Sequence, residues 1–262
     1  LRKAPKRLAG LTAPTVFASA ARRSCSGEGL PRPRWGLAMT VSASSRRLAR
    51  ASARLQLQFH HILQPIMTNP RKPDHPVNPM FINRWSPRSL TGEALSQETL
   101  MTVLEAARWA PSAYNAQPWR FIYALKDDAG WAGIFGAVNE GNQSWAHRAG
   151  ALVAVASAKQ ALFPGKTEMT ANAWHSFDTG SAWMSMALQA AQSGLVAHAL
   201  AGFDPVKLRA AIHLPDDYAL EAVIVLGKQG DKAQLPEALQ QREAPNARKP
   251  LTEISFAGTF KA

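Results

Sequence analysis

Residues 151–157 read Ala-Leu-Val-Ala-Val-Ala-Ser, an apolar run that contains no charged residue. A short run without polar alternation is typical of a β-strand that is covered on both of its faces. Three further segments favour strands by their content of β-branched, aromatic and aliphatic residues, namely 119–125, 195–200 and 220–226. Residues 151–157 therefore predict a buried strand within one central sheet.

Apolar residues at helical spacing predict helices between these strands. Ser96 can cap a helix whose apolar face is Leu100, Val103, Leu104 and Ala107. Shorter helices are predicted over residues 127–138 and 204–212. Residues 178–193, with Asp178 as the cap, predict a long helix that is apolar almost all round, so we expect a partner subunit to cover it. This order of elements indicates a mixed α+β (α/β) domain around one sheet.

The charge of the chain is concentrated in its first quarter. Residues 1–66 hold 12 Lys and Arg and one acidic residue, Glu28, which accounts for +11 of the formal net charge of +12. Residues 67–262 are near neutral, so a basic, nucleic-acid-binding globule is not expected. The single cysteine, Cys25, leaves residues 67–262 without a disulfide, a Cys-ligated metal or a cysteine nucleophile. Apolar runs stay well below about 18 residues, so we expect no membrane span.

Residues 1–66 are rich in Arg, Ser, Ala and Pro. We predict that they are disordered or not native, and that residues 67–262 form the folded domain in the cytoplasm. The same composition suits an organelle transit peptide, which would change the location. An RNA-binding arm is a third reading, although the aromatic residues of the segment are too scattered to form a stacking platform.

Several common catalytic and binding motifs are absent from the sequence. It contains no GxGxxG, no GxxxxGK[ST] and no GxSxG. The histidines of residues 67–262 show neither HxxxH nor HxH spacing, so no metal site is predicted. His198 stands apart from the others because it lies in a predicted strand beside a glycine turn.

Three segments suit an anionic, planar ligand. In RWSPR at 84–88, two guanidinium groups bracket a hydroxyl, and arginine donates to phosphate through two hydrogen bonds while keeping its charge. In APSAYNAQPW at 110–119, two prolines fix a polar loop that offers Ser, Asn and Gln side chains. RKP at 248–250 adds a basic pair in the tail. Each segment taken alone could also be an ordinary surface turn.

Taken together and in this order, the three segments resemble the FMN-dependent nitroreductase family. GNQSW at 141–145 and GLVAHALAGFD at 194–204 match the family pattern more weakly, and the resemblance spans about residues 78–262. It implies a nitroreductase-like fold, with a central and mostly antiparallel sheet flanked by helices. It also implies an intertwined homodimer that binds FMN at the interface between its subunits.

The resemblance also implies roles for individual residues. Arg84, Ser86 and Arg248 would hold the phosphate and ribityl chain of FMN. Arg88 would lie by the N1/C2 side of the flavin, where a cation stabilises the reduced ring. Trp85 would pack under the flavin or at the rim of the site. The remaining implied contacts are Pro111, Ser112 and Asn115 from the second subunit, Asn142 at the ring, and Leu200, Ala201 and Gly202 through the backbone near N5.

The implied activity is transfer of hydride from NADH or NADPH to flavin N5, and then by a ping-pong scheme to an electron-poor small molecule of the nitroaromatic or quinone class. Because the flavin carries the hydride, no side chain is predicted as a catalytic acid or base. A reductive dehalogenase, a flavin-processing enzyme and a non-enzymatic FMN-binding protein are the alternatives. Nucleic acids and membranes are not expected partners.

Overall fold

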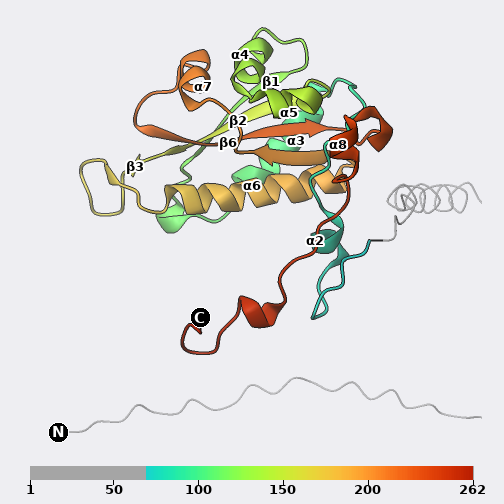
Figure 1. Cartoon of the computed structure of the whole chain (residues 1–262). Coiled ribbons are helices and arrows are strands. Elements are labelled where there is room, and N and C mark those ends of the chain that lie inside the picture. Colours follow the sequence, from blue (N-terminus) through green and yellow to red (C-terminus); the bar gives the residue numbers. More distant parts are fainter. Residues whose placement is uncertain (1–68, 262) are drawn as a thin grey trace, which may run out of the picture. The chain divides into compact units, whose positions relative to one another are not determined.

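A computed structural model describes residues 69–261, and the predictions for residues 1–66 lie outside this range. Figure 1 shows a sheet with helices on both of its faces. Its strands are β1 (Trp119–Leu125), β2 (Ala151–Ala158), β6 (Tyr218–Gly227) and β5 (Val196–Leu200), and they lie in the order β1-β2-β6-β5. Every neighbouring pair is antiparallel. The predicted α+β class with a mostly antiparallel sheet is confirmed.

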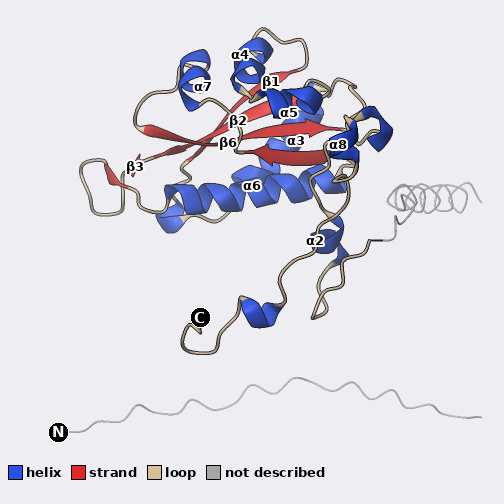
Figure 2. Cartoon of the chain, viewed as in Figure 1, coloured by secondary structure: helices blue, strands red, loops and turns tan. Residues whose placement is uncertain are grey.

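Helices cover both faces of the sheet (Figure 2), and a separate apolar core lies on each face. Val153 and Val155 of β2 point into the first core, together with α3 (Gln97–Arg108) and α6 (His175–Gln192). Leu152 and Ala154 point into the second core, which is formed with α4 (Trp131–Ala137), α5 (Glu140–Ala146) and α7 (Pro205–Ala211). Because alternate residues of a strand face opposite sides, this burial confirms that β2 is covered on both faces.

Helix α6 differs from its prediction at its start. It begins at His175, and Asp178 lies in the first turn instead of at the cap. The Asp178 carboxylate accepts a hydrogen bond from the backbone N–H of Ala113 at 3.0 Å. One face of α6 is buried against the sheet and α3, whereas its outer face leaves Phe177 exposed and Met184 and Leu188 half-buried. Cover of this outer face by a partner stays a prediction.

The other helix ends follow the local signals of the sequence more closely. The Ser96 side chain caps α3 by accepting from the backbone N–H of Thr99 at 3.1 Å. The Asp204 side chain caps α7, whose first residue is Pro205. Helix α4 is shorter than predicted because residues 125–130 form a turn, in which the Asp128 carboxylate accepts from the backbone N–H of Leu125.

Short elements complete the fold. They are α2 (Pro79–Asn83), the 3₁₀ turns η1 (Ala113–Asn115), η2 (Lys232–Gln234) and η3 (Leu251–Glu253), the helix α8 (Glu237–Gln240), and the two-stranded hairpin β3 (Gln160–Ala161) with β4 (Thr170–Ala171). The sequence of residues 228–262, polar and with three prolines, predicts an extended tail, but this segment contains the three short helical segments η2, α8 and η3. Among the helices between residues 69 and 261, none is long and apolar enough to cross a membrane.

Candidate functional site

Residues 84–88, which we call the arginine turn, lead from α2 towards the sheet. Arg84 ends α2, and its backbone N–H donates to the carbonyl of Met80 at 3.1 Å. The backbone N–H groups of Arg88 and Ser89 both donate to Oε1 of Glu243, at 2.7 and 2.8 Å. The Glu243 side chain is only 2% exposed. A carboxylate from the segment after α8 therefore fixes the conformation of this turn.

Three guanidinium groups gather beside this turn, and they belong to Arg71, Arg84 and Arg248. Burial, followed by the nearby charge of Arg248, lowers the pKa of Arg84. Burial, followed by the charges of Arg248 and Arg84, lowers the pKa of Arg71. Within residues 69–261 none of the three forms an ion pair with a carboxylate. Such a cluster of like charges favours the binding of an anion.

The Arg84 side chain adds a second sign of an anion site. Its Nη1 lies 3.5 Å from the hydroxyl oxygen of Ser86. Its Nε is buried and has no hydrogen-bond partner among the described residues. A buried donor without a partner costs about 1–3 kcal/mol, which a bound acceptor would offset. A phosphate group fits this donor set, because it carries negative charge and several acceptor oxygens.

Arg88 lies near a buried carboxylate and a half-buried histidine. Its Nη1 is 4.0 Å from Oε2 of Glu243. Nδ1 of His198 lies 3.0 Å from the carbonyl oxygen of Pro87, so Nδ1 carries the proton in this bond. Burial is the main cause that lowers the pKa of His198, and the charge of Arg88 lowers it further. Burial and the charge of Arg88 therefore both favour the neutral form of this histidine.

Asn142 and Gly202 lie against each other at the end of β5. The Asn142 side chain donates to the carbonyl of Gly202 at 3.3 Å. A Cβ placed on Gly202 would lie 2.6 Å from Nδ2 of Asn142, so only glycine fits here without a shift. Leu200 is 3% exposed, so it can offer only its backbone to a ligand. Two sequence segments predicted to meet the same ligand are thus brought together.

His198 links this pair to the arginine turn. It lies on β5 four residues before Gly202, and its ring is 4.8 Å from that of Trp145 on α5, the helix that carries Asn142. At about 3.3 Å per strand residue, four residues span roughly 13 Å. His198, which contacts the carbonyl of Pro87, and the Asn142–Gly202 pair are therefore separated by roughly 13 Å along the chain.

The loop at residues 110–119 is shaped by its backbone. Tyr114, Asn115 and Gln117 have positive φ angles of 52°, 55° and 47°. The backbone N–H of Gln117 donates to the Ser112 hydroxyl oxygen at 3.0 Å, and that of Asn115 donates to the Ser112 carbonyl at 3.0 Å. Three non-glycine residues in the left-handed region are costly, and such strain clusters at functional sites.

This loop does not join the arginine turn within one chain. The bond from Ala113 to Asp178 holds it at the start of α6. The arginine turn follows α2, whose Met80 sulfur accepts from the Gln192 side chain at the far end of α6. At about 1.5 Å per residue, Asp178 and Gln192 lie about 21 Å apart along the helix. The loop that holds Pro111, Ser112 and Asn115 therefore lies near one end of α6, and the residues that follow α2 lie near its other end (Figure 1).

Sequence reasoning missed two residues that shape the site, Arg71 and Glu243. Arg71 lies in a proline-rich segment without helical or strand periodicity, and Glu243 follows a four-residue helix. Their partners lie up to 175 and 155 positions away in the chain. No local pattern identifies such contacts. Trp85, by contrast, was singled out by sequence and is half-buried in the turn, where its predicted role stays a prediction.

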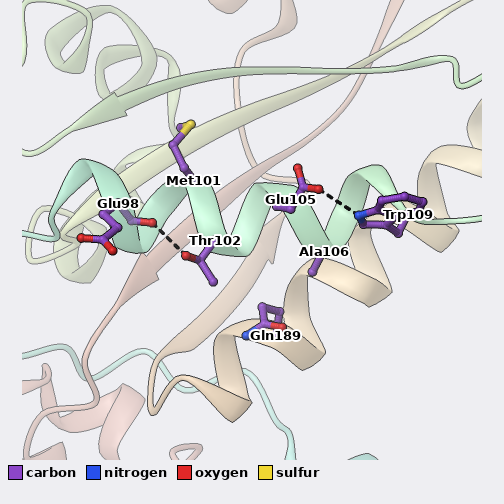
Figure 3. A pocket seen from close by; sticks show the side chains of 7 residues that line it. All are labelled: Glu98, Met101, Thr102, Glu105, Ala106, Trp109 and Gln189. Atoms are coloured by element: carbon purple, nitrogen blue, oxygen red, sulfur yellow. Dashed lines mark hydrogen bonds between the residues drawn. The ribbon is translucent and has the colours of Figure 1, made fainter.

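A separate groove of about 590 Å³ lies on the outer side of α3, next to α6 (Figure 3). It is lined by Glu98, Met101, Thr102, Glu105, Ala106, Trp109 and Gln189. The Trp109 indole N–H donates to Glu105 at 2.9 Å at one end of the groove. None of the predicted site residues lines it, so this groove is not part of the candidate site.

The chain is an antiparallel α+β sheet domain, with a cluster of arginines beside residues 84–88 and an asparagine–glycine contact just after β5. The chain matches the model of the Nitroreductase family over residues 82–135 and 128–228. With more than half of the chain matched, it belongs to the nitroreductase family.

Individual relatives agree with this assignment. A solved structure described as an oxidoreductase containing FMN is 41% identical, covers 74% of this chain and 98% of its own, and superposes with a TM-score of 0.71. A putative nitroreductase in complex with FMN from Desulfovibrio desulfuricans is 25% identical, covers 72% of this chain and 99% of its own, and has a TM-score of 0.57. An uncharacterised 15.4 kDa protein of Mycolicibacterium smegmatis is 36% identical over 128 residues, which are 48% of this chain and 82% of that protein.

Proposed function

We propose that this protein binds FMN and is an oxidoreductase that takes hydride from NADH or NADPH and delivers it to an electron-poor small molecule. Membership of the nitroreductase family and similarity to an oxidoreductase containing FMN support the proposal. One observation of the site carries it. The buried Nε of Arg84 has no partner among the described residues. The charge of Arg248 lowers the pKa of Arg84, and the charges of Arg248 and Arg84 lower the pKa of Arg71, so the three guanidinium groups lie close together.

The residues present fit FMN at both ends of the molecule. Arg84 and Arg248 would neutralise its phosphate, and the Ser86 hydroxyl would donate to a phosphate or ribityl oxygen. Gly202 lets the backbone pack closely against Asn142, since a Cβ there would lie 2.6 Å from Nδ2 of Asn142. Bound FMN would supply hydride transfer at its N5 atom. Arg88 would supply fixed positive charge to the ring side of the site.

We also propose that a homodimer completes the site. Within one chain, the loop of Pro111, Ser112 and Asn115 lies at one end of α6 and the arginine turn at the other. A second copy packed antiparallel on the outer face of α6 would bring its loop to the arginine turn of the first. The half-buried Met184 and Leu188 give this face an apolar stripe that such a contact would bury.

The electron donor and the acceptor would use the site one after the other. A bound flavin offers one open ring face to both molecules, so a ping-pong scheme is expected. The oxidised nicotinamide would leave before the acceptor enters. An acceptor of the nitroaromatic or quinone class suits this scheme because such molecules are flat and electron-poor. Burial lowers the pKa of His198, and the scheme assigns it no proton-transfer role.

The test begins with the purified full chain. We expect it to carry FMN absorbance that NADH or NADPH bleaches under anaerobic conditions and that a nitroaromatic or a quinone restores. Arg84→Ala should lose FMN, whereas Arg108→Ala, at an exposed arginine of α3, should retain it. A protein that never takes up FMN would refute the proposal. A flavin that neither nucleotide bleaches would indicate a non-enzymatic FMN-binding protein.

A further inference from the structure

Arg71 connects three segments that are distant in sequence. Its Nε donates to the carbonyl of Asn246 at 2.7 Å. Its Nη1 donates to the carbonyls of Ile82 and Arg84, at 3.0 and 2.9 Å. One guanidinium group therefore joins the segment before α2, the arginine turn and the C-terminal segment.

These bonds leave one nitrogen of Arg71 for a ligand. Nε and Nη1 are both used, and Nη2 donates to no group among residues 69–261. The two neighbouring cations are Arg84, whose carbonyl Arg71 holds, and Arg248, which lies two residues beyond Asn246. Nη2 of Arg71 is thus an unused donor of a group that lies close to two phosphate-binding candidates.

The C-terminal segment packs against the residues around Arg71. The carbonyl of Asn246 accepts from both Arg71 and Arg248, at 2.7 and 3.3 Å. Further along, the backbone N–H of Leu251 donates to the Asp74 carboxylate at 2.9 Å, and Asp74 lies three residues after Arg71. Packing of residues 246–251 onto residues 71–74 therefore brings Arg248 towards Arg84 and Arg71, against the repulsion of three like charges.

We propose that Arg71 is a third phosphate-binding arginine, and that it couples the binding of a phosphate group to the packing of residues 246–251. This inference rests on the proposed FMN function. A phosphate between the three guanidinium groups removes their mutual repulsion and thereby stabilises the packed C-terminal segment. Because riboflavin lacks the phosphate, the three arginines make the site select FMN over riboflavin.

Binding to the flavin-free full chain tests the selectivity. Arg71→Ala should weaken FMN binding at least about tenfold, a loss of about 1.4 kcal/mol, and should change riboflavin binding less than about twofold. Unchanged riboflavin binding also shows that the variant is folded. Lys72→Ala is the matched control, since Lys72 is exposed and makes no ion pair among the described residues, and it should bind both flavins like the natural chain.

Hydrogen exchange of the backbone amide of Leu251 tests the coupling. Inorganic phosphate or FMN should slow this exchange in the natural chain and in Lys72→Ala, and should have little effect in Arg71→Ala. Equal loss of both flavins in Arg71→Ala, or equal protection of Leu251 in all three proteins, would overturn the inference. If the natural chain binds neither flavin but phosphate still protects Leu251, the proposed FMN function fails, and the coupling of phosphate binding to the packing of residues 246–251 stands.

Discussion

The carboxylate of Glu243 holds the backbone of Arg88 and, at the same time, faces its guanidinium group. Oε1 accepts from the N–H groups of Arg88 and Ser89 at 2.7 and 2.8 Å, and Oε2 lies 4.0 Å from Nη1 of Arg88. The Glu243 carboxylate therefore sets the conformation of the turn and offsets part of the charge of Arg88. Two effects, one geometric and one electrostatic, can be separated by substitution.

Glu243→Ala should destabilise the fold more than Glu243→Gln. Alanine leaves two backbone N–H groups in the turn without an acceptor, which costs about 3 kcal/mol in total, whereas glutamine keeps an acceptor oxygen and costs about 1 kcal/mol. Urea unfolding of the flavin-free protein measures both. Glu237→Gln is the control, at an exposed acid of α8, and should stay within about 0.5 kcal/mol of the natural chain. Equal losses in the two Glu243 variants would mean that the backbone bonds contribute little.

His198 makes stability depend on pH. Its pKa is lowered by burial in the folded state, so below the ordinary value of 6.5 the unfolded chain takes up a proton that the folded chain resists. Stability should therefore fall as the pH drops from about 7 towards 5, and His198→Asn should reduce this slope while keeping a side-chain N–H for the carbonyl of Pro87. Urea midpoints at several pH values measure the slope. His147→Asn, just after α5, is the control, and an unaltered slope in His198→Asn would remove His198 as its source.

Two glycines near the site offer a matched comparison. Gly202→Ala would place Cβ 2.6 Å from Asn142, whereas Gly141→Ala on α5 meets no atom within 4 Å. We expect Gly202→Ala to weaken FMN binding by at least about tenfold through displacement of Asn142, with a small effect on the melting temperature. Gly141→Ala should bind FMN normally. Flavin titration and thermal unfolding of both variants decide the point, and equal FMN affinity would show that the Asn142–Gly202 pair does not meet the ligand.

The outer face of α6 should hold two subunits together. Leu188→Glu places a charge in the apolar stripe of this face, and we expect sedimentation to change from twice the mass of one chain to once that mass. FMN should be lost with the dimer, because the loop of Ser112 and Asn115 then has no arginine turn to complete. Lys207→Glu, on α7 at the opposite face of the sheet, is the control. An FMN-loaded monomer of the natural chain or of Leu188→Glu would show that one chain suffices to bind FMN.

The sequence predicted those parts of the fold that have local causes. Ser96 and Asp204 cap their helices by bonds to backbone groups within three residues, and residues 151–157 are apolar because both faces of β2 are buried. The start of α6 was missed because Asp178, which looks like a cap, bonds to Ala113 across 65 positions. A tertiary contact here outweighs the local preference of the side chain.

The residues of the site also divide into those with local causes and those that depend on tertiary contacts. Arg84, Ser86 and Arg88 lie within five residues, so their arrangement could be read from the sequence as one motif. Arg248 was noted as part of a basic pair in the tail, whereas Asn142 and Gly202 were added by resemblance alone, and the structure brings Arg248 to Arg84 and Asn142 to Gly202. Arg71 and Glu243 stayed hidden because they act through main-chain bonds to distant segments. Such contacts depend on the fold and leave no spacing to detect.

Arg84 and Arg88 should differ in what they do for a bound flavin. A fixed cation near the ring interacts more strongly with the reduced, negatively charged form than with the neutral oxidised form, so its loss penalises the reduced form. Arg88→Ala should lower the midpoint potential by about 30 mV or more, which corresponds to about 1.4 kcal/mol for a two-electron couple. Arg84→Ala should weaken FMN binding more than Arg88→Ala does and leave the potential of the remaining bound flavin nearly unchanged.

Redox titrations and FMN dissociation constants of the two variants test this difference. Arg88→Lys is the control, because it keeps the charge and should retain most of the potential. Glu243→Gln should change the midpoint potential in the opposite direction. Removal of the carboxylate 4.0 Å from Arg88 leaves the positive charge of Arg88 less balanced, so the potential should rise. If Arg88→Ala and Arg84→Ala lose FMN equally, and the potential moves in neither Arg88→Ala nor Glu243→Gln, then Arg88 does not act on the ring and belongs with the phosphate-binding arginines.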